Sequence, residues 1–489
     1  MAGIDASRQA FLERRLAEAK AEADVTANAA PPFAGERLSR ADVEWLVADR
    51  AARGAEARGA DTRGKSARGA LADALDLRRA VLREGGDPID LSGMTLSRAQ
   101  LDDADLAGAN LRRTRLERAN LYRATLAGVD LDDAVLTGAN LSGASLKDAR
   151  AQRARCEGAI FSLADLSGAD FKLAVLDCAD MRLACLKGTV LRTKRLSGAK
   201  FRRAHLEGAD LQGAQLVAGH PDDEELARIR TWIPEFPRRL DAANLREAFF
   251  DSATILKGTV LAVGGDAVRV VDAHWNDVNL ATVSWSHQFA RRGARLGDEI
   301  MARRGQGGSG PAVDAEDMHD AVRANRQLAV TLRGQGLNEE ADIFAYRAQL
   351  CQRDLLGRRV RQGERGSVGA LLFSWFLWLL TGYGYRMKRI VFTYAIVVLA
   401  FAGAYYAFQG GPLPFAAMGH SGAAASLAAV WHKGIEALVL SVTAFHGRVF
   451  AGGFGAATPQ GVVTAIEAIF GLVIEGVFIA MLTQRFFSR

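Results

Sequence analysis

The chain has 489 residues, with 62 Lys and Arg against 56 Asp and Glu, and its formal net charge of +6 gives no reason to expect a nucleic-acid partner. Residues 366–489 are apolar and almost free of acids, which excludes an ordinary soluble globule. Four cysteines without CxxC or CxxH spacing support neither a disulfide framework nor a zinc site, so we expect no metal or cofactor.

The N-terminal region, residues 1–88, is charged and begins without an apolar signal segment, so we expect it to lie in the cytoplasm. Residues 6–24 and 38–52 have patterns typical of helices, and Ser39 is suited to cap the second of them. An Arg-Gly pair recurs every five residues in 53–69 without a buried Leu. This stretch is either a degenerate cap or a low-complexity linker.

A five-residue repeat runs through residues 91–216. Every fifth position from Leu91 to Leu216 is apolar at 26 consecutive sites, and a second series two residues earlier is mostly Ala. A period of five fits neither a helix nor a strand, so it requires a coil that turns by a fixed angle every five residues. The Leu and Ala side chains then point inward and stack on the next coil, because one coil cannot bury its own apolar face.

These repeats, for example GANL at Gly108–Leu111, resemble the pentapeptide-repeat family. The resemblance implies a right-handed quadrilateral β-helix with four repeats per coil over residues 89–217. The same period returns in fragments within 218–300, so we predict an insertion with a short helix in 220–239. Degenerate repeats then continue the rod to about residue 286.

The charge of the rod limits its function. Some family members mimic DNA, which requires an acidic rod, but residues 91–217 contain 15 acids and 19 bases. The rod also offers no nucleophile, metal cluster or phosphate-binding loop. We therefore expect a rigid spacer or a docking surface for a protein partner, and not an enzyme.

Residues 301–313 contain the sequence GQGGSG, which we interpret as a linker. The apolar spacing then becomes helical in 314–366, on both sides of Gly334–Asn338, and resembles a single tetratricopeptide-type helix pair. The expected packing face of its second helix consists of Ala341, Phe344, Ala345 and Ala348. We expect this pair to be an adaptor between the rod and the membrane segment.

Residues 367–389 place apolar and Trp side chains on one helical face and end in a basic cluster, which predicts an interfacial helix on a lipid bilayer. Ile390–Phe408 and Val462–Thr483 are each long and apolar enough to span a bilayer. Basic residues precede the first stretch and follow the second. The positive-inside rule then predicts a multi-pass protein of the cell (inner) membrane with both termini cytoplasmic.

Residues 390–489 resemble the two-transmembrane tetrameric ion channels related to potassium channels, and more narrowly 90–489 resembles bacterial pentapeptide-repeat proteins with an ion-channel domain. Leu427–Phe445, which carries Glu436, has the pattern of a re-entrant pore helix, and Ser441–Thr443 (SVT) matches its end in the family. The resemblance implies a homotetramer with an all-α pore domain. The implied filter residues are Thr443, Ala444, Phe445, His446, Gly447 and Arg448, where the pore helix gives way to a short extended segment. The implied pore-lining residues are Glu467, Gly471, Glu475, Phe478 and Leu482.

The filter departs from the potassium pattern. Potassium selectivity relies on a TVGYG strand whose glycines permit an alternating backbone, and here only Gly447 remains. A ring of four Arg448 side chains would repel cations unless they turned away or paired with acids. We therefore do not predict potassium selectivity, and the permeant ion stays open.

Glu467 and Glu475 lie within a predicted span, where a carboxylate is costly unless it meets water, a cation or a partner. They fall on approximately one helix face with Gly471 and Phe478. One interpretation is that they line a conduit. The other is that they pair with Arg448, His446 or Lys433, or form an interhelical hydrogen bond. The two interpretations can coexist. The leading hypothesis is a tetrameric ion channel gated or positioned by the rod. The alternative is a non-conducting, membrane-anchored scaffold.

Overall fold

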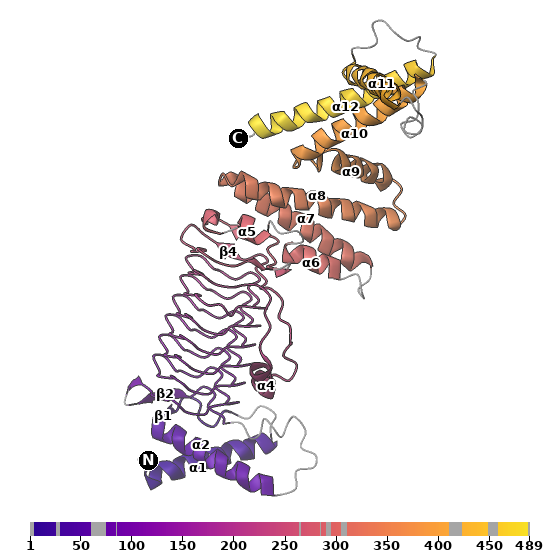
Figure 1. Ribbon diagram of the computed structural model, residues 1–489. Coiled ribbons are helices and arrows are strands. Elements are labelled where there is room, and N and C mark those ends of the chain that lie inside the picture. Colours follow the sequence, from indigo (N-terminus) through magenta and orange to yellow (C-terminus); the bar gives the residue numbers. More distant parts are fainter. Residues whose placement is uncertain are drawn as a thin grey trace. The chain divides into compact units, whose positions relative to one another are not determined.

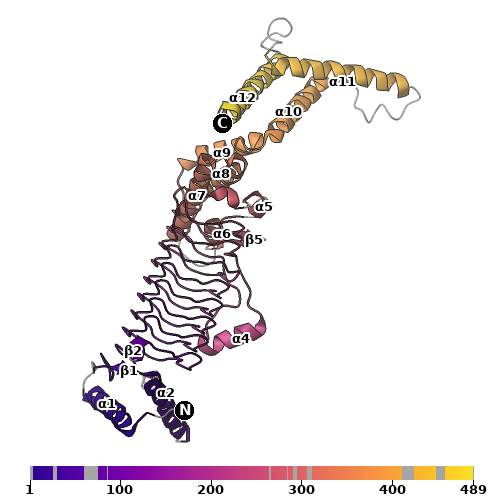
Figure 2. The same ribbon diagram turned by 90° about the vertical axis from the view of Figure 1, so that its left-hand side faces the viewer.

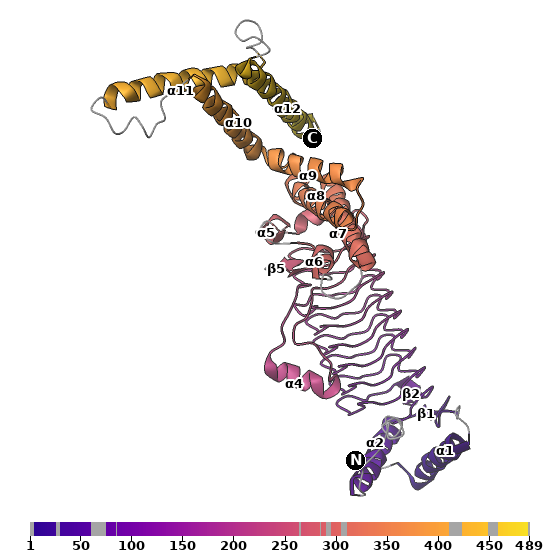
Figure 3. The ribbon, with the colours of Figure 1, turned by 90° about the vertical axis from the view of Figure 1, so that its right-hand side faces the viewer.

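The computed structural model describes residues 4–25, 30–59, 75–84, 86–263, 266–283, 285–289, 295–304, 311–409, 423–447 and 458–487. The chain divides into two compact units, Met1–Gln352 and Arg353–Arg489. The first unit contains a rod with helices at its ends, and the second contains helices α9, α10, α11 and α12 (Figures 1, 2 and 3). Helix α8 runs across the division between them.

The first unit is built around a β-helix of stacked five-residue repeats. Parallel bridges join residues 20 apart, such as Asp90 and Asn110, so one coil contains four repeats. Backbone groups pair from coil to coil: the Leu91 N–H donates to the Asn110 carbonyl at 2.8 Å. The Leu and Ala series fill the interior, as at Leu146 and Ala154, which are fully buried. The repeat predicted from the sequence is therefore confirmed.

The backbone conformation at the corners of the coil explains why Gly and polar residues recur there. At most repeats, the residue two places after the interior Leu or Phe turns the corner with a positive φ, as at Gly108 (71°), Asp148 (57°) and Leu163 (62°). Gly takes this left-handed conformation without strain, whereas a residue with a Cβ is disfavoured there. This is why Gly recurs in the repeat, and it marks Leu163, which is also exposed, as a strained position.

The rod begins before residue 89, the predicted start. Asp76 bridges to Gln100 and Val81 to Asp105, so Asp76 and Val81 already belong to a coil of the rod. Strand β2 (Val81–Glu84) also pairs in parallel with β1 (Arg37–Leu38) and antiparallel with β3 (Asp87–Pro88). The sequence missed this coil because its bridges span 24 residues instead of 20, which breaks the five-residue phase.

The rod also ends earlier than the predicted residue 286. Strand β4 (Phe249–Phe250) pairs with β7 (His274–Trp275), after which Leu280 begins a 3₁₀ turn and α5 (Trp285–Phe289) follows. Both Leu280 and Trp285 are buried, as the period suggested, but the Trp285 indole N–H donates to the Leu280 carbonyl at 2.8 Å. The five-residue spacing therefore correctly predicted that Leu280 and Trp285 are buried. It did not predict that a 3₁₀ turn and a helix, and not a further coil, contain them. The antiparallel pair of β5 (Ala262–Val263) and β6 (Asp266–Ala267) lies between β4 and β7 in the chain.

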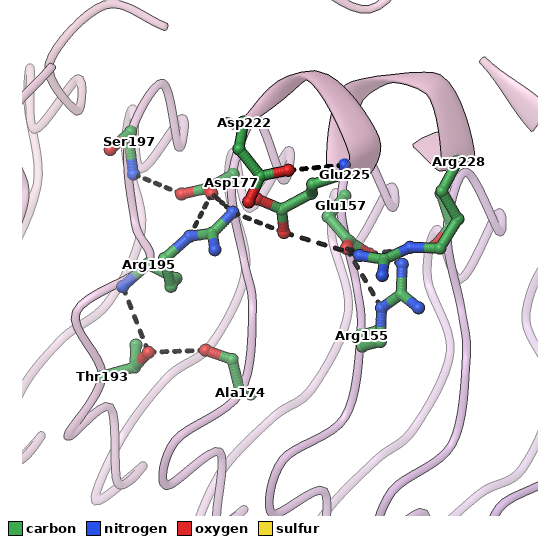
Figure 4. A network of polar contacts seen from close by, with 11 residues as sticks. Arg155, Glu157, Ala174, Asp177, Thr193, Arg195, Ser197, Asp222, Glu225 and Arg228 are labelled. Atoms are coloured by element: carbon green, nitrogen blue, oxygen red, sulfur yellow. Dashed lines mark hydrogen bonds and ion pairs between the residues drawn. The ribbon is translucent and has the colours of Figure 1, made fainter. Parts of the chain in front are cut away.

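The predicted insertion is a docked helix. Helix α4 (Asp223–Trp232) is capped by Asp222, whose side chain accepts from the Glu225 N–H at 2.7 Å. Figure 4 shows α4 beside two buried carboxylates of the rod, and Arg195 joins Asp177 (2.6 Å) to Glu225 of α4 (3.0 Å). Burial raises the pKa of the Asp177 carboxyl even though Arg195 donates to it. The insertion is thus held on the rod by a charged network.

Helices cover both ends of the β-helix. At the N-terminal end, α1 (Ala6–Val25) and α2 (Arg40–Gly59) share one buried cluster with the rod through Leu12 and Leu46. Ser39 caps α2 as predicted: it accepts from the Asp42 N–H, and its own N–H donates to the Asp42 carboxylate. The 60–69 part of the Arg-Gly stretch lies outside the described residues.

At the other end, α6 (Gly297–Arg304), α7 (Pro311–Gly334) and α8 (Asn338–Arg361) follow the last coil. Phe344 of α8 packs edge-on against Trp285 and Phe289 within the same cluster as the rod. The helix pair predicted in 314–366 is therefore present. The GQGGSG sequence at 305–310 lies outside the described residues.

Side-chain amides join α7 to the rod. Gln327 accepts from the Asp272 N–H at 3.0 Å and donates to the Asp272 carboxylate at 2.9 Å. Arg347 of α8 pairs with the buried carboxylate of Glu299 at 3.1 Å. Gln327 thus joins α7 to the last coil, and Arg347 joins α8 to α6.

In the second unit, α9 (Ser367–Thr381) precedes α10 (Met387–Phe408), α11 (Ala423–Phe445) and α12 (Pro459–Phe487). The stretches Arg389–Phe408 and Pro459–Met481 are long and apolar enough to span a membrane, close to the predicted 390–408 and 462–483. Val398, Phe445, Ile474 and Met481 are buried together where α10, α11 and α12 pack.

Substituting Leu163 by Gly should stabilise the rod by about 0.5–1 kcal/mol, because relief of the left-handed strain exceeds the entropy cost of Gly. The measurement is urea unfolding of the full chain in detergent. Leu163→Ala is the matched control, since it removes the same exposed side chain but keeps the Cβ. An equal gain in both variants would contradict the backbone explanation.

Candidate functional site

The predicted filter begins inside a helix. Thr443, Ala444 and Phe445 form the last turn of α11, and the Thr443 hydroxyl lies 2.9 Å from the carbonyls of Val439 and Leu440. They belong to the helix predicted at Leu427–Phe445, so the extended segment that the resemblance implies after the pore helix does not include them. Without glycines to permit an alternating backbone, the segment continues the helical hydrogen-bonding pattern.

The helix stops at Gly447. Its φ of 68° is left-handed, and its N–H donates to the Ala444 carbonyl at 2.9 Å, a common way for a helix to end. His446 lies within this turn. Arg448, the last residue of the predicted filter, lies outside the described residues.

Glu467 of α12 is fully buried among three helices. One carboxylate oxygen lies 2.8 Å from the Tyr405 hydroxyl of α10, and the other accepts from the Ser441 hydroxyl of α11. The Tyr405 hydroxyl also lies 3.1 Å from Thr464 Oγ1. This arrangement corresponds to the interhelical hydrogen bond that the sequence left open. With these bonds, the Glu467 carboxylate is not exposed at the surface of a single chain.

Glu475, two turns further along α12, has a different environment. Its carboxylate contacts Nδ1 of His446, and Nε2 of His446 lies 3.5 Å from the Tyr394 hydroxyl. The side chains of His446 and Glu475 are 40% and 43% exposed. The two glutamates that share a predicted helix face thus separate into a buried one and a half-exposed one.

Gly471 lies where α11 and α12 touch. A Cβ at this position would be 1.8 Å from the Phe445 carbonyl oxygen, so only Gly lets the end of α11 approach so closely. Gly471 is required because no side chain fits there, and not because of its backbone conformation, which is that of an ordinary helix. Phe478 packs beside the buried cluster of Ile474 and Met481. The side chain of Leu482 lies outside the described residues.

Glu436 lies on a separate, exposed face of α11. It is 3.3 Å from His432 one helical turn earlier, and both side chains are largely exposed. Lys433, a candidate partner for the glutamates, donates instead to the Gln409 carbonyl at 3.3 Å. Within the described parts of the chain, no group of three or more His, Cys, Asp or Glu side chains is placed to hold a metal ion.

Sequence reasoning missed three hydroxyl partners. The hydroxyl groups near the Glu467 carboxylate and the His446 imidazole belong to Tyr405, Thr464 and Tyr394. In the sequence, each of these is an ordinary residue of an apolar helix. Thr464 carried a signal, because a hydroxyl three residues before Glu467 lies on the same helix face. The two tyrosines gave none, since their contact depends on how α10 packs against its neighbours.

Comparison with known proteins identifies the repeats. Residues 99–138, 130–168, 154–192 and 195–217 match the family model of the pentapeptide repeats. These ranges lie in the rod, so the rod is composed of pentapeptide repeats. No curated protein matches the chain.

Several solved structures are similar to this chain. HetL, a pentapeptide repeat protein involved in heterocyst differentiation regulation from the cyanobacterium Nostoc sp., is 26% identical over 47% of this chain and 95% of that chain, with a TM-score of 0.19. Full-length QnrB1, a plasmid-mediated fluoroquinolone resistance protein, is 14% identical over 44% and 97%, also with a TM-score of 0.19. A pentapeptide repeat protein from the thylakoid lumen of Arabidopsis thaliana is 21% identical over 29% and 72%, with a TM-score of 0.14.

Replacing Gly471 by Ala should lower the free energy of unfolding of the second unit by about 2 kcal/mol or more, because the new methyl group overlaps the Phe445 carbonyl. Unfolding in SDS, followed by the helical circular dichroism signal of the full chain, measures the effect. Gly476→Ala is the matched control, since a Cβ there meets nothing within 4 Å. Equal stability of the two variants would contradict the close approach.

Proposed function

We propose that the chain is a membrane protein whose second unit assembles with further copies into a pore for ions, with the pentapeptide-repeat rod as a sensing or positioning domain. The observation that carries this proposal is the half-exposed pair of His446 and Glu475 at the end of α11. Glu475 belongs to Pro459–Met481, one of the two stretches long and apolar enough to span a membrane.

A half-exposed carboxylate and imidazole are costly against lipid, so a pair at this depth needs water or another protein surface beside it. The other exposed side chains of α12 are mostly apolar, for example Ile469 and Leu472, and suit lipid. A closed ring of copies would turn the polar pairs toward a shared axis and the apolar faces outward. The resemblance to two-transmembrane channels suggests a homotetramer.

The conduction mechanism that follows is unlike that of a potassium channel. Because Thr443–Phe445 form the last turn of α11, they do not build the extended strand whose carbonyls replace an ion's hydration shell in a potassium channel. Ions would instead pass hydrated through a polar constriction lined by His446 and Glu475. The balance between the carboxylate and the imidazole would then set the preferred charge of the ion.

The distribution of basic residues suggests the orientation. Arg386, Lys388 and Arg389 lie at the start of α10, and Arg485 lies at the end of α12. By the positive-inside rule these ends face the cytoplasm, in a cell (inner) membrane protein with both termini cytoplasmic. The rod would then present its surface to a cytoplasmic protein partner.

A non-conducting, membrane-anchored scaffold is the second candidate. It is favoured by Glu467, whose carboxylate is fully hydrogen-bonded within one chain and needs no lumen. The helical end of α11 also favours it, because a carbonyl filter is missing there. In this case the rod would be the functional surface and the second unit its anchor.

Planar-bilayer recording of the purified full chain under a tenfold KCl gradient tests the pore. Glu475→Gln should change the conductance or the reversal potential, because it removes a charge from the constriction. Glu339→Gln, at the start of α8 in the first unit, is the control and should leave both unchanged. Silence of the wild type, together with cross-linking that finds only monomers, would exclude the pore and favour the scaffold.

A further inference from the structure

Two arginines of the second unit are stacked on one pair of tryptophans. The Arg353 guanidinium carbon lies 4.3 Å from the ring centre of Trp375 and 4.9 Å from that of Trp378. The Arg389 guanidinium carbon lies 4.9 Å from the Trp378 ring. The indole planes of Trp375 and Trp378 meet edge to face, which fixes both rings. Two cations are therefore held at defined positions around Trp378.

Neither cation has a counter-ion in the described part of the chain. Arg389 donates to the Trp378 carbonyl at 3.0 Å, which leaves its charge uncompensated. Nη1 of Arg353 is buried and has no hydrogen-bond partner. Like charges repel when they are held on one ring pair, and a buried N–H without an acceptor is unfavourable. Both facts point to an absent anionic acceptor, and guanidinium forks fit phosphate well.

The surroundings favour a lipid over a soluble anion. Helix α9 carries both tryptophans, and its Leu372, Phe373 and Leu379 side chains are at least 60% exposed. Arg389 is the first residue of the candidate span Arg389–Phe408. Apolar side chains, tryptophans and arginines at the start of a span are typical of a membrane interface.

We propose that Arg353 and Arg389, oriented by Trp375 and Trp378, bind the phosphate of an anionic phospholipid headgroup. The phosphate accepts from both guanidinium groups, and the acyl chains of the lipid lie along the exposed apolar face of α9. The site would fix α9 in one leaflet at the point where the chain enters the membrane. This inference rests on the membrane location in the proposed function and is independent of ion conduction.

The test uses the full chain in detergent, titrated with phosphatidylglycerol or phosphatidylcholine, with lipid binding counted by native mass spectrometry. The wild type should retain phosphatidylglycerol and discriminate against phosphatidylcholine. Arg353→Gln/Arg389→Gln is the test variant. Its control is Arg361→Gln/Arg365→Gln, which removes two nearby charges that are exposed and stack on neither tryptophan.

The test variant should bind phosphatidylglycerol about tenfold more weakly than the control, because it loses two charge-assisted contacts in addition to diffuse attraction. Equal weakening in the two variants would overturn the site and leave only diffuse attraction. Arg353→Lys/Arg389→Lys keeps the charge and loses the planar fork, so its affinity should fall between the others. Circular dichroism checks that each variant is folded.

A second arm replaces the lipid with inorganic phosphate. Stabilisation of the wild type by phosphate as large as that by phosphatidylglycerol would identify a soluble-anion site and overturn the lipid assignment. A chain that retains phosphatidylglycerol, carries no current and cross-links only as a monomer keeps this inference and contradicts the pore. A chain that conducts and does not distinguish the two lipids contradicts this inference alone.

Discussion

The stacking of one coil on the next is the constraint on which the first unit depends. A single coil of four repeats has an apolar interior only one Leu and one Ala deep at each side, so it is stable only with a neighbour above and below. Most corner residues also adopt the left-handed backbone conformation. The repeat is therefore a compromise between a large side chain that fills the interior and a Gly, or a tolerated strain, that turns the corner.

The same constraint explains what surrounds the rod. A stack of coils exposes unpaired N–H and C=O groups at both ends, and α1 and α2 at one end and α5 to α8 at the other cover them. The contacts at the C-terminal end are also polar, since Gln327 joins α7 to the rod and Arg347 joins α8 to α6. The N-terminal end of the rod is thus covered by two helices, and the C-terminal end by helices that include the pair of α7 and α8.

In the second unit, one close approach separates the two glutamates. Because Gly471 lets the end of α11 touch α12, Ser441 reaches Glu467 and Tyr405 closes the other side. The helix ends soon after, at Gly447, so Glu475 meets only the turn at His446 and keeps much of its surface exposed. The position at which α11 stops therefore decides which carboxylate is structural and which is available for function.

The sequence by itself determined the rod, its interior residues and the two membrane-length helices, because these depend on periodicity and composition within short stretches of chain. It also predicted the helix pair and the short helix of the insertion. Tertiary structure alone decided that the chain at Asp76 and Val81 joins the rod, since its bridges span 24 residues. It likewise decided the environments of Glu467 and Glu475. Helical spacing places both on one face, but burial depends on how far a neighbouring helix extends across that face, and this distance is set by packing between segments remote in the sequence.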